Sequence, residues 1–253
     1  EAYVSYAVAN REPSRRNYRD ADPGEQPRKE VLHDYEMGYT HQTLEGKISA
    51  NVYYMDYKDQ LVLTGEINNV GEAIMTNAKD SYRAGVELIA GARIRSNLTW
   101  DINLTLSRNK IKDFTTYVDN WDEGGQISKN LGTTDISFSP GVITGSHIRY
   151  EPVRNLKISL MSKYVGKQYI DNTSSEKRKL DPYFVNNLLV DYTFSLDWFE
   201  EVNLSLKVNN MLDEKYETNA WVYRYYYQDE YYKMTGYFPQ AGRNYLLGLT
   251  VRF

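Results

Sequence analysis

The sequence contains no cysteine, only three histidines and no apolar run of the roughly 18 residues that a transmembrane helix needs. The absence of cysteine excludes disulfide bonds, thiolate metal sites and a thiol nucleophile. The mean hydropathy of −0.65 is also too low for a helical membrane protein. The net charge of −4 does not indicate a nucleic-acid-binding surface, so we expect no nucleic-acid partner.

Alternation of apolar and polar residues predicts ten β-strands. It is clearest at residues 98–107, 202–209 and 242–253, and it continues at 156–160 and 187–194. Looser alternation covers residues 4–8, 35–39, 48–54, 82–92 and 142–150. Because side chains alternate between the two faces of a strand, each segment has one apolar and one polar face.

The two faces predict a membrane barrel. We expect the apolar set to face lipid: Leu98, Trp100, Ile102, Leu104, Val202, Leu204, Leu206, Leu247, Leu249 and Val251. We expect the polar set to face a hydrated lumen: Arg83, Glu87, Asp101, Asn103, Asp191, Asn203, Lys207 and Asn209. A soluble β-sandwich or adhesion module is an alternative, because half-buried strands alternate in the same way.

Connection lengths also alternate. Short connections are expected at 44–46, 94–97, 151–155 and 195–201, and long ones at 10–30, 63–75, 113–135, 167–182 and 212–242. Outer-membrane barrels have short periplasmic turns and long external loops. The 24 tyrosines suit the aromatic girdles of such barrels. The sequence therefore predicts an all-β fold, a transmembrane antiparallel up-and-down β-barrel, with the chain ending on the periplasmic side.

The chain begins within a strand-like segment, without Met or a signal sequence, so we expect its beginning to be missing. Ten strands in lipid must close on themselves or form one arc of a larger barrel, because open edges leave backbone groups unpaired. A closed ten-stranded barrel acting as an enzyme or a passive channel is therefore a second alternative.

Five segments resemble the C-terminal half of TonB-dependent outer-membrane receptors, especially those of Bacteroides-like bacteria. They are DYEMGY at 34–39, NVYYMDYKDQLV at 51–62, SYRAGVEL at 81–88, VNNMLDEKYE at 208–217 and GRNYLLGLTVRF at 242–253. The resemblance implies a 22-stranded barrel whose last ten strands are residues 1–253. The plug domain and the earlier strands would precede this chain.

The resemblance also implies function and partners. The whole protein would import a scarce nutrient, a ferric siderophore or another iron source, with cobalamin, haem, a glycan or a peptide as alternatives. Its partners would be outer-membrane lipid, the barrel-assembly machinery, a small-molecule ligand and, through the missing plug, the inner-membrane TonB complex. We expect neither a cofactor nor an enzyme. Ser146 and His147 are adjacent in one strand, as are His33 and Asp34, so neither pair can form a catalytic dyad.

An aromatic segment at 221–237 is the candidate ligand site. Its predicted contacts are Trp221, Tyr223, Arg224, Tyr225, Tyr227 and Tyr231, which could stack on a planar ligand and pair with its anionic groups. Alternatively, the rings pack against each other and the outer girdle. Family resemblance assigns Tyr245 and Phe253 to an assembly signal. Asp119, Asp122 and Glu123 lack the spacing of a calcium loop, so we predict a solvated acidic turn and no metal site.

Overall fold

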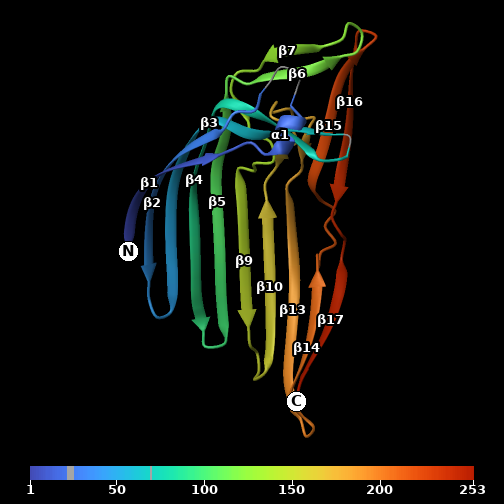
Figure 1. Ribbon diagram of the computed structural model, residues 1–253. Helices are drawn as coiled ribbons and strands as arrows, with labels where there is room; N and C mark the ends of the chain where they lie inside the picture. The colour runs from blue at the N-terminus through green and yellow to red at the C-terminus, as the bar shows by residue number, and fades with distance from the viewer. Residues whose placement is uncertain (22–25, 69) are drawn as a thin grey trace.

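The computed structural model describes residues 1–21, 26–68 and 70–253. Over these residues the chain is nearly all β-strand, with one short helix (Figure 1). The elements are β1 (Ala2–Arg11), α1 (Arg15–Arg19), β2 (Glu30–Gln42), β3 (Gly46–Ile67), β4 (Ala73–Arg95), β5 (Leu98–Lys112), β6 (Thr115–Asn120), β7 (Gln126–Asn130), β8 (Thr134–Asp135), β9 (Val142–Tyr150), β10 (Leu156–Val165), β11 (Gln168–Tyr169), β12 (Lys179–Leu180), β13 (Tyr183–Leu196), β14 (Phe199–Asn209), β15 (Glu217–Tyr227), β16 (Glu230–Pro239) and β17 (Asn244–Arg252). No helix among the described residues is long and apolar enough to cross a bilayer.

The main sheet is an antiparallel meander. Its strands follow the order β1-β2-β3-β4-β5-β9-β10-β13-β14-β17, and the short strand β8 pairs with β5. Nine of the ten predicted strands lie within one strand of this path, and the tenth, 242–253, contains β17, so the predicted antiparallel up-and-down arrangement is confirmed. The described part of the sheet is open, because β1 pairs only with β2 and β17 only with β14. The ten strands therefore do not close on themselves.

The strand register places the predicted apolar and polar sets on opposite faces. Across six strands, Leu98, Tyr150, Ile158, Val190, Leu206 and Leu247 are successive cross-strand partners. We call this side the apolar face and the other the polar face. Many large side chains on the apolar face are exposed, Val4 to 81% and Leu247 to 80%, although Val202 is buried. A second sheet does not cover these positions, which argues against the soluble sandwich.

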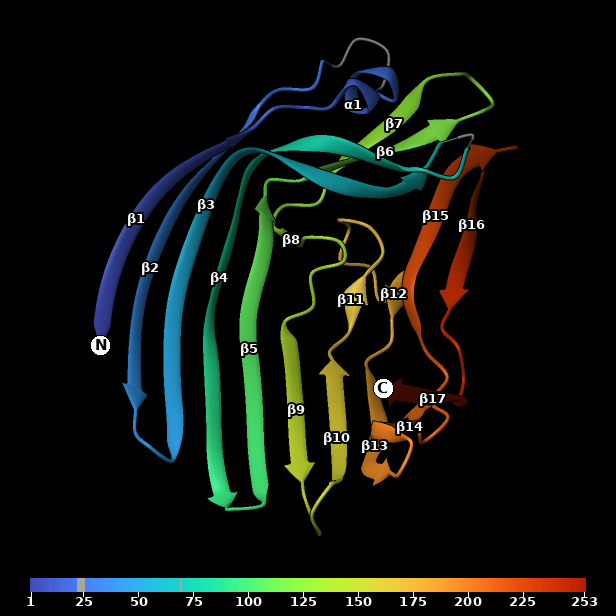
Figure 2. The same ribbon diagram turned by 60° about the horizontal axis from the view of Figure 1, so that its bottom comes forward.

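The two ends of the sheet differ as the connection lengths predict. Short connections join the strands at one end, the turn end, whereas all the long connections gather at the other, the loop end (Figures 1 and 2). Phe253 lies at the turn end, where its ring meets Phe199 edge-on at 5.2 Å between centroids. The chain thus finishes at the turn end, the end that we expect to face the periplasm.

The long connections contain more structure than their polar sequences predict. The expected connection 63–75 is largely strand, because β3 and β4 pair as a hairpin that continues beyond the rest of the sheet. The connections 113–135 and 212–242 contain β6–β7 and β15–β16, which join in a second, four-stranded sheet. Within 10–30, Ser14 caps α1 through a reciprocal contact with Asn17. Residues 22–25 and 69, also in expected connections, lie outside the described residues.

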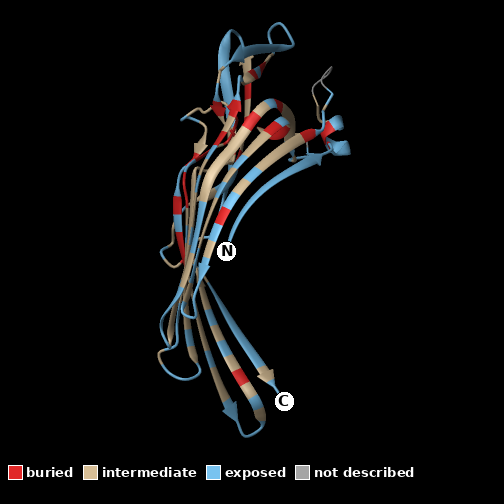
Figure 3. Ribbon diagram, turned by 90° about the vertical axis from the view of Figure 1, so that its left-hand side faces the viewer, coloured by how far each residue is buried: buried red, intermediate tan, exposed pale blue. Residues whose placement is uncertain are grey.

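The buried residues concentrate at the loop end (Figure 3). One cluster, Val62, Ala78, Ile111 and Ile136, packs the upper parts of β3, β4 and β5 against the segment after β8. Another, Ile170, Leu180, Ala220 and Val222, joins the β10–β13 connection to β15. Fully burying an aliphatic side chain contributes about 1.5–3 kcal/mol. The long connections are therefore packed into a folded layer above the wall.

Candidate functional site

The hairpin β15–β16 divides the six predicted ligand contacts between its two sides. Trp221, Tyr223, Tyr225 and Tyr227 alternate along β15 and share one side. Arg224 points to the opposite side. Tyr231 joins it there, because Tyr231 is the cross-strand partner of Tyr226. Stacking and ionic contacts thus belong to two different surfaces.

A fifth ring, Trp121 from the β6–β7 connection, joins the aromatic side. Its ring stacks on Tyr225 at 4.2 Å and lies 6.3 Å from Tyr223 and 6.4 Å from Tyr227. Tyr225 also stacks on Tyr232 at 5.4 Å. We call Trp121, Tyr223, Tyr225, Tyr227 and Tyr232 the aromatic ridge. Sequence reasoning missed Trp121, since only its tertiary contacts bring it to a hairpin a hundred residues away.

Hydrogen bonds hold the ridge to the neighbouring loop. The Tyr223 hydroxyl donates to Asp119 Oδ2 at 2.7 Å and accepts from Trp121 Nε1 at 3.2 Å. Burial of the phenol and the nearby Asp119 carboxylate raise the pKa of Tyr223 to about 12. Tyr223 therefore stays neutral at physiological pH and fixes the position of Trp121.

Asp122 stabilises the tip of the hairpin. Its carboxylate accepts backbone hydrogen bonds from Gln228 at 2.7 Å and Asp229 at 3.1 Å. Both residues have positive φ, 54° and 58°, so the carboxylate holds a turn in the sparsely populated left-handed region. The acidic turn therefore supports the hairpin, while Glu123 remains exposed. The described residues contain no group of three or more His, Asp or Glu side chains that could hold a metal ion.

The side of β15 opposite the ridge carries a buried charge cluster. Asp171, 1% exposed, accepts from Arg178 Nε at 2.6 Å, and its Oδ2 lies 3.8 Å from Arg224 Nε. Arg224 is 7% exposed and also donates to the Tyr117 carbonyl at 3.3 Å. Arg178 reaches the Tyr231 hydroxyl at 3.4 Å. In this arrangement the Arg224 guanidinium faces Asp171 and not solvent, and the cluster links the β10–β13 connection to the outer hairpin.

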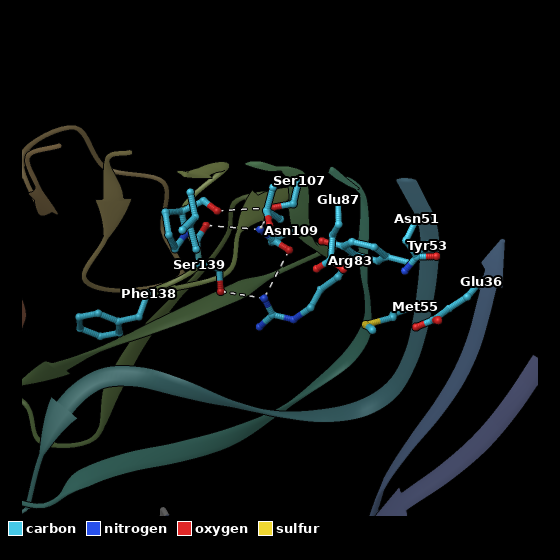
Figure 4. Close-up of a pocket in the computed structure, with 13 residues that line it drawn as sticks. Glu36, Asn51, Tyr53, Met55, Arg83, Glu87, Ser107, Asn109, Phe138 and Ser139 are labelled. Carbon is cyan, nitrogen blue, oxygen red and sulfur yellow. Dashed lines mark hydrogen bonds between the residues drawn. The ribbon is translucent and has the colours of Figure 1, made fainter. Parts of the chain in front are cut away.

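A pocket lies on the polar face of β2–β5, apart from the aromatic ridge (Figure 4). This lumen pocket has a volume of about 370 Å³. Its side chains include Glu36, Asn51, Tyr53, Met55, Arg83, Glu87, Thr105, Ser107, Asn109 and Ser139. Of these, only Arg83 and Glu87 were among the expected lumen residues. The others, except Ser139 in the segment before β9, occupy the same polar parity of their strands, which was the signal that could have identified them.

Arg83 joins the pocket wall to the segment before β9. Its guanidinium donates to Asn109 Oδ1 at 3.3 Å and to Ser139 Oγ at 3.0 Å (Figure 4). Glu36 and Glu87 add two carboxylates to the same hollow. Phe138, Pro140 and Ile143 also line the pocket, and its polar side chains can form hydrogen bonds with water, with a polar solute or with another domain.

The histidines do not form a catalytic arrangement with their neighbours. Nδ1 of His33 lies 2.9 Å from the Tyr6 hydroxyl. Ser146 Oγ accepts from Trp100 Nε1 at 2.8 Å, on the face opposite His147. The geometry thus matches the expectation that these sequence neighbours point apart.

The proposed assembly residues both lie at exposed positions. Tyr245, 64% exposed, belongs to the apolar face of β17. Phe253, 85% exposed, follows the last residue of that strand. Because β17 is an edge strand, its outer backbone groups are free to pair with another strand.

Comparison with protein families identifies this architecture. The model of the family described as "TonB dependent receptor-like, beta-barrel" matches residues 1–211. The chain belongs to this family. It is accordingly a β-barrel wall segment of the bacterial outer membrane.

Individual relatives agree with this assignment. The pesticin receptor of Yersinia enterocolitica is 25% identical over 197 residues, which are 75% of this chain and 25% of that protein. The ferric yersiniabactin uptake receptor FyuA of Yersinia pestis superimposes with a TM-score of 0.64 at 20% identity, over 98% of this chain and 34% of that one. The ferric-catecholate import receptor Fiu of E. coli K12 gives a TM-score of 0.67 at 16% identity, over 100% and 33%. The chain thus spans a quarter to a third of these relatives.

Proposed function

We propose that this chain is the C-terminal part of the barrel of a TonB-dependent receptor that imports a ferric siderophore across the outer membrane. The open sheet supports the partial barrel, because its edge strands β1 and β17 need partners in lipid. The remaining strands and a plug that engages the inner-membrane TonB complex would belong to the rest of the protein. The barrel-assembly machinery would insert the whole protein.

The aromatic ridge supports the choice of cargo. It presents stacked rings at the loop end, of which Trp121, Tyr227 and Tyr232 are exposed, and the ring centroids of Trp121 and Tyr225 lie only 4.2 Å apart. Aromatic surfaces favour planar ligands, such as the ring systems of many iron chelators. Several similar structures are receptors for siderophores or ferric chelates, including the siderophore receptor PiuA of Acinetobacter baumannii, with a TM-score of 0.68 at 14% identity. One similar structure is described as a copper transporter, so the cargo needs a direct test.

Two surfaces would act in sequence along the import route. The ridge would capture the chelate outside, and the polar face, including the lumen pocket, would line the hydrated passage after the plug moves. That wall is hydrated because it carries the carboxylates of Glu36 and Glu87 and the guanidinium of Arg83. The wall itself needs no cofactor.

The test is ligand binding to the whole receptor, purified in detergent. Ferric catecholate, ferric phenolate, haem, cobalamin and an oligosaccharide are titrated, and Trp fluorescence is measured. We expect a ferric siderophore to bind most tightly, and Tyr225→Ala to weaken that binding at least tenfold through loss of the central stacked ring. Stacking on one ring contributes about 0.5–1.5 kcal/mol, and the neighbouring rings lose their alignment as well.

Tyr237→Ala is the matched control, because it removes the same side chain from the other side of the same hairpin, where Tyr237 is 48% exposed. Its affinity should match wild type. Tight binding of a cargo without iron, with no response to ferric siderophores, would refute the proposed substrate class. Equal effects of the two substitutions would refute the ridge as the contact surface.

A further inference from the structure

The apolar face changes character in rows as β1–β5 approach the loop end. The first row is Val4, Met37, Val52, Val86 and Leu106, all apolar and in register. Two residues further along, the next row is Tyr6, Tyr35, Tyr54, Ala84 and Arg108. The third row contains His33, Asp56, Tyr82 and Lys110, and the fourth Lys58, Asp80 and Lys112. This order matches the passage from hydrocarbon through the interface to the headgroups.

The tyrosines of these rows form a continuous belt. Ring centroids are 4.9 Å apart for Tyr6 and Tyr35, 6.5 Å for Tyr35 and Tyr54, and 5.9 Å for Tyr54 and Tyr82. Tyrosine rings concentrate where hydrocarbon meets headgroups, with the hydroxyl toward water. The belt therefore fixes the depth of β1–β4, and it places Arg108 at the level of the interface.

The cations above the belt differ in how they are neutralised. Lys58 contacts Asp80 and lies 3.8 Å from Asp56. Lys110 pairs with Asp135 at 2.7 Å. Lys112 lies over the Tyr82 ring, with Nζ 5.7 Å from the centroid.

Arg108 is the exception among these cations. It is exposed and makes no hydrogen bond or ion pair with any residue that the structure describes. Its cross-strand partner is Ala84, whose small side chain leaves space beside the guanidinium. A charge at the boundary of hydrocarbon is costly without a partner, and Arg108 directly follows the apolar row on the same face of β5. The protein does not supply the anion in this part of the chain, whereas the lipid can.

We propose that Arg108, together with Lys112, binds a phosphate-bearing lipid headgroup of the outer leaflet. The planar guanidinium can bind two phosphate oxygens at once, and the Lys112 ammonium adds charge from the fourth row. The lipid's acyl chains would lie along Leu106 and Val86, in the row directly below. Because that apolar row continues the site, a lipid fits it better than a free phosphate ion. The site is independent of the imported cargo.

The experiment uses the whole receptor, folded in detergent and titrated with lipid A, a glycolipid with two phosphates, and with the same glycolipid after dephosphorylation. Native mass spectrometry measures bound lipid. Wild type should prefer the phosphorylated form. Each basic residue near a membrane surface contributes about fivefold to the binding of anionic lipid, so Arg108→Gln/Lys112→Gln should reduce that preference about 25-fold. Lys157→Gln/Lys207→Gln removes the same charge from the polar face and should leave the preference unchanged.

Three results would overturn the proposal. The first is an unchanged preference in the Arg108/Lys112 variant, and the second is an equal loss in the polar-face control. The third is displacement of the lipid by millimolar inorganic phosphate, which would assign the patch to a free anion. If the double variant does not fold, as judged by heat-modifiable migration, Arg108→Lys replaces it. That variant keeps the charge but loses the two-point contact, and it should lower the preference by severalfold; an unchanged preference would again refute the site.

Discussion

At the scale of single residues, Tyr223 connects the ridge to its support. The phenol is partly buried, and its hydroxyl donates a hydrogen bond to Asp119. Its pKa of about 12 lies above that of an unfolded tyrosine, about 10. Between these two values the unfolded chain releases the proton before the folded hairpin does. The contribution of Tyr223 to the free energy of unfolding is therefore fully present below about pH 10, and it is lost as the pH rises toward 12.

We expect the difference in tyrosinate absorbance between wild type and Tyr223→Phe to show a titration near pH 12. Asp119→Asn should lower that pKa, because it removes the negative charge beside the hydroxyl. The control is the difference in tyrosinate absorbance between wild type and Tyr227→Phe, because Tyr227 is an exposed ring of the same strand. A Tyr223 titration that coincides with the bulk of the tyrosines would contradict the arrangement.

Asp171 is a second residue on which the loop layer depends. It is the anion that faces both Arg178 and Arg224, and all three side chains are largely buried. Asp171→Asn would leave two guanidinium groups without a carboxylate. Breaking a buried ion pair on one side typically costs about 3–5 kcal/mol.

We expect Asp171→Asn to accelerate proteolysis and hydrogen exchange in the β10–β13 connection and in β15, with the lower wall unchanged. Asp181→Asn is the control, since Asp181 is 83% exposed and only approaches Lys179 at 3.8 Å. Surface pairs of that kind contribute little. Equal exchange in wild type and Asp171→Asn would show that the cluster does not hold the loops.

At the scale of elements, β17 combines an exposed edge with an aromatic terminus. Phe253 contacts Phe199 across the turn end at 5.2 Å, which fixes the end of the strand against β14. An interfacial aromatic ring also sets the depth of a strand in the bilayer. Removing it should let β17 fray where the barrel closes.

In the whole receptor, we expect deletion of Phe253 or Phe253→Asp to reduce the heat-modifiable, folded fraction in the outer membrane severalfold. Thr250→Ser, on the polar face opposite Asn203, should leave that fraction unchanged. Wild-type yield from both Phe253 variants would remove its role in assembly, although the barrel fold would still stand.

At the scale of the whole molecule, the sheet has one face suited to lipid and one suited to water. Leu104 and Asn103 are neighbours in β5 and face opposite sides. Leu104 partners Leu88 on the apolar face, and Asn103 partners Ile89 and Gly145 on the other. The same substitution at these two positions should therefore have very different costs.

Leu104→Arg places a charge in the hydrocarbon and should destabilise the receptor by about 2–4 kcal/mol in lipid, whereas Asn103→Arg should cost less than about 1 kcal/mol. Reversible urea unfolding of each variant from liposomes measures the difference. A larger loss for Asn103→Arg would reverse the assignment of the two faces.

The sequence by itself determined the wall. Period-two alternation is a local property, so segments such as 98–107 and 202–209 reveal their strands and faces without knowledge of their neighbours. Up-and-down order follows from short turns, because adjacent strands then have no other partner to reach. The polar parity indicated the lumen side for the same reason, although only two residues of the lumen pocket were named in advance.

Only the tertiary structure decided the loop layer. The connection 63–75 reads as a polar loop, yet β3 and β4 extend through most of it because each satisfies the other's backbone hydrogen bonds. Trp121 joins Tyr225, and Asp171 faces Arg224, through contacts between segments far apart in the chain. Local periodicity predicts which face of a strand a side chain occupies, but it does not predict which distant segment of the chain contacts that face.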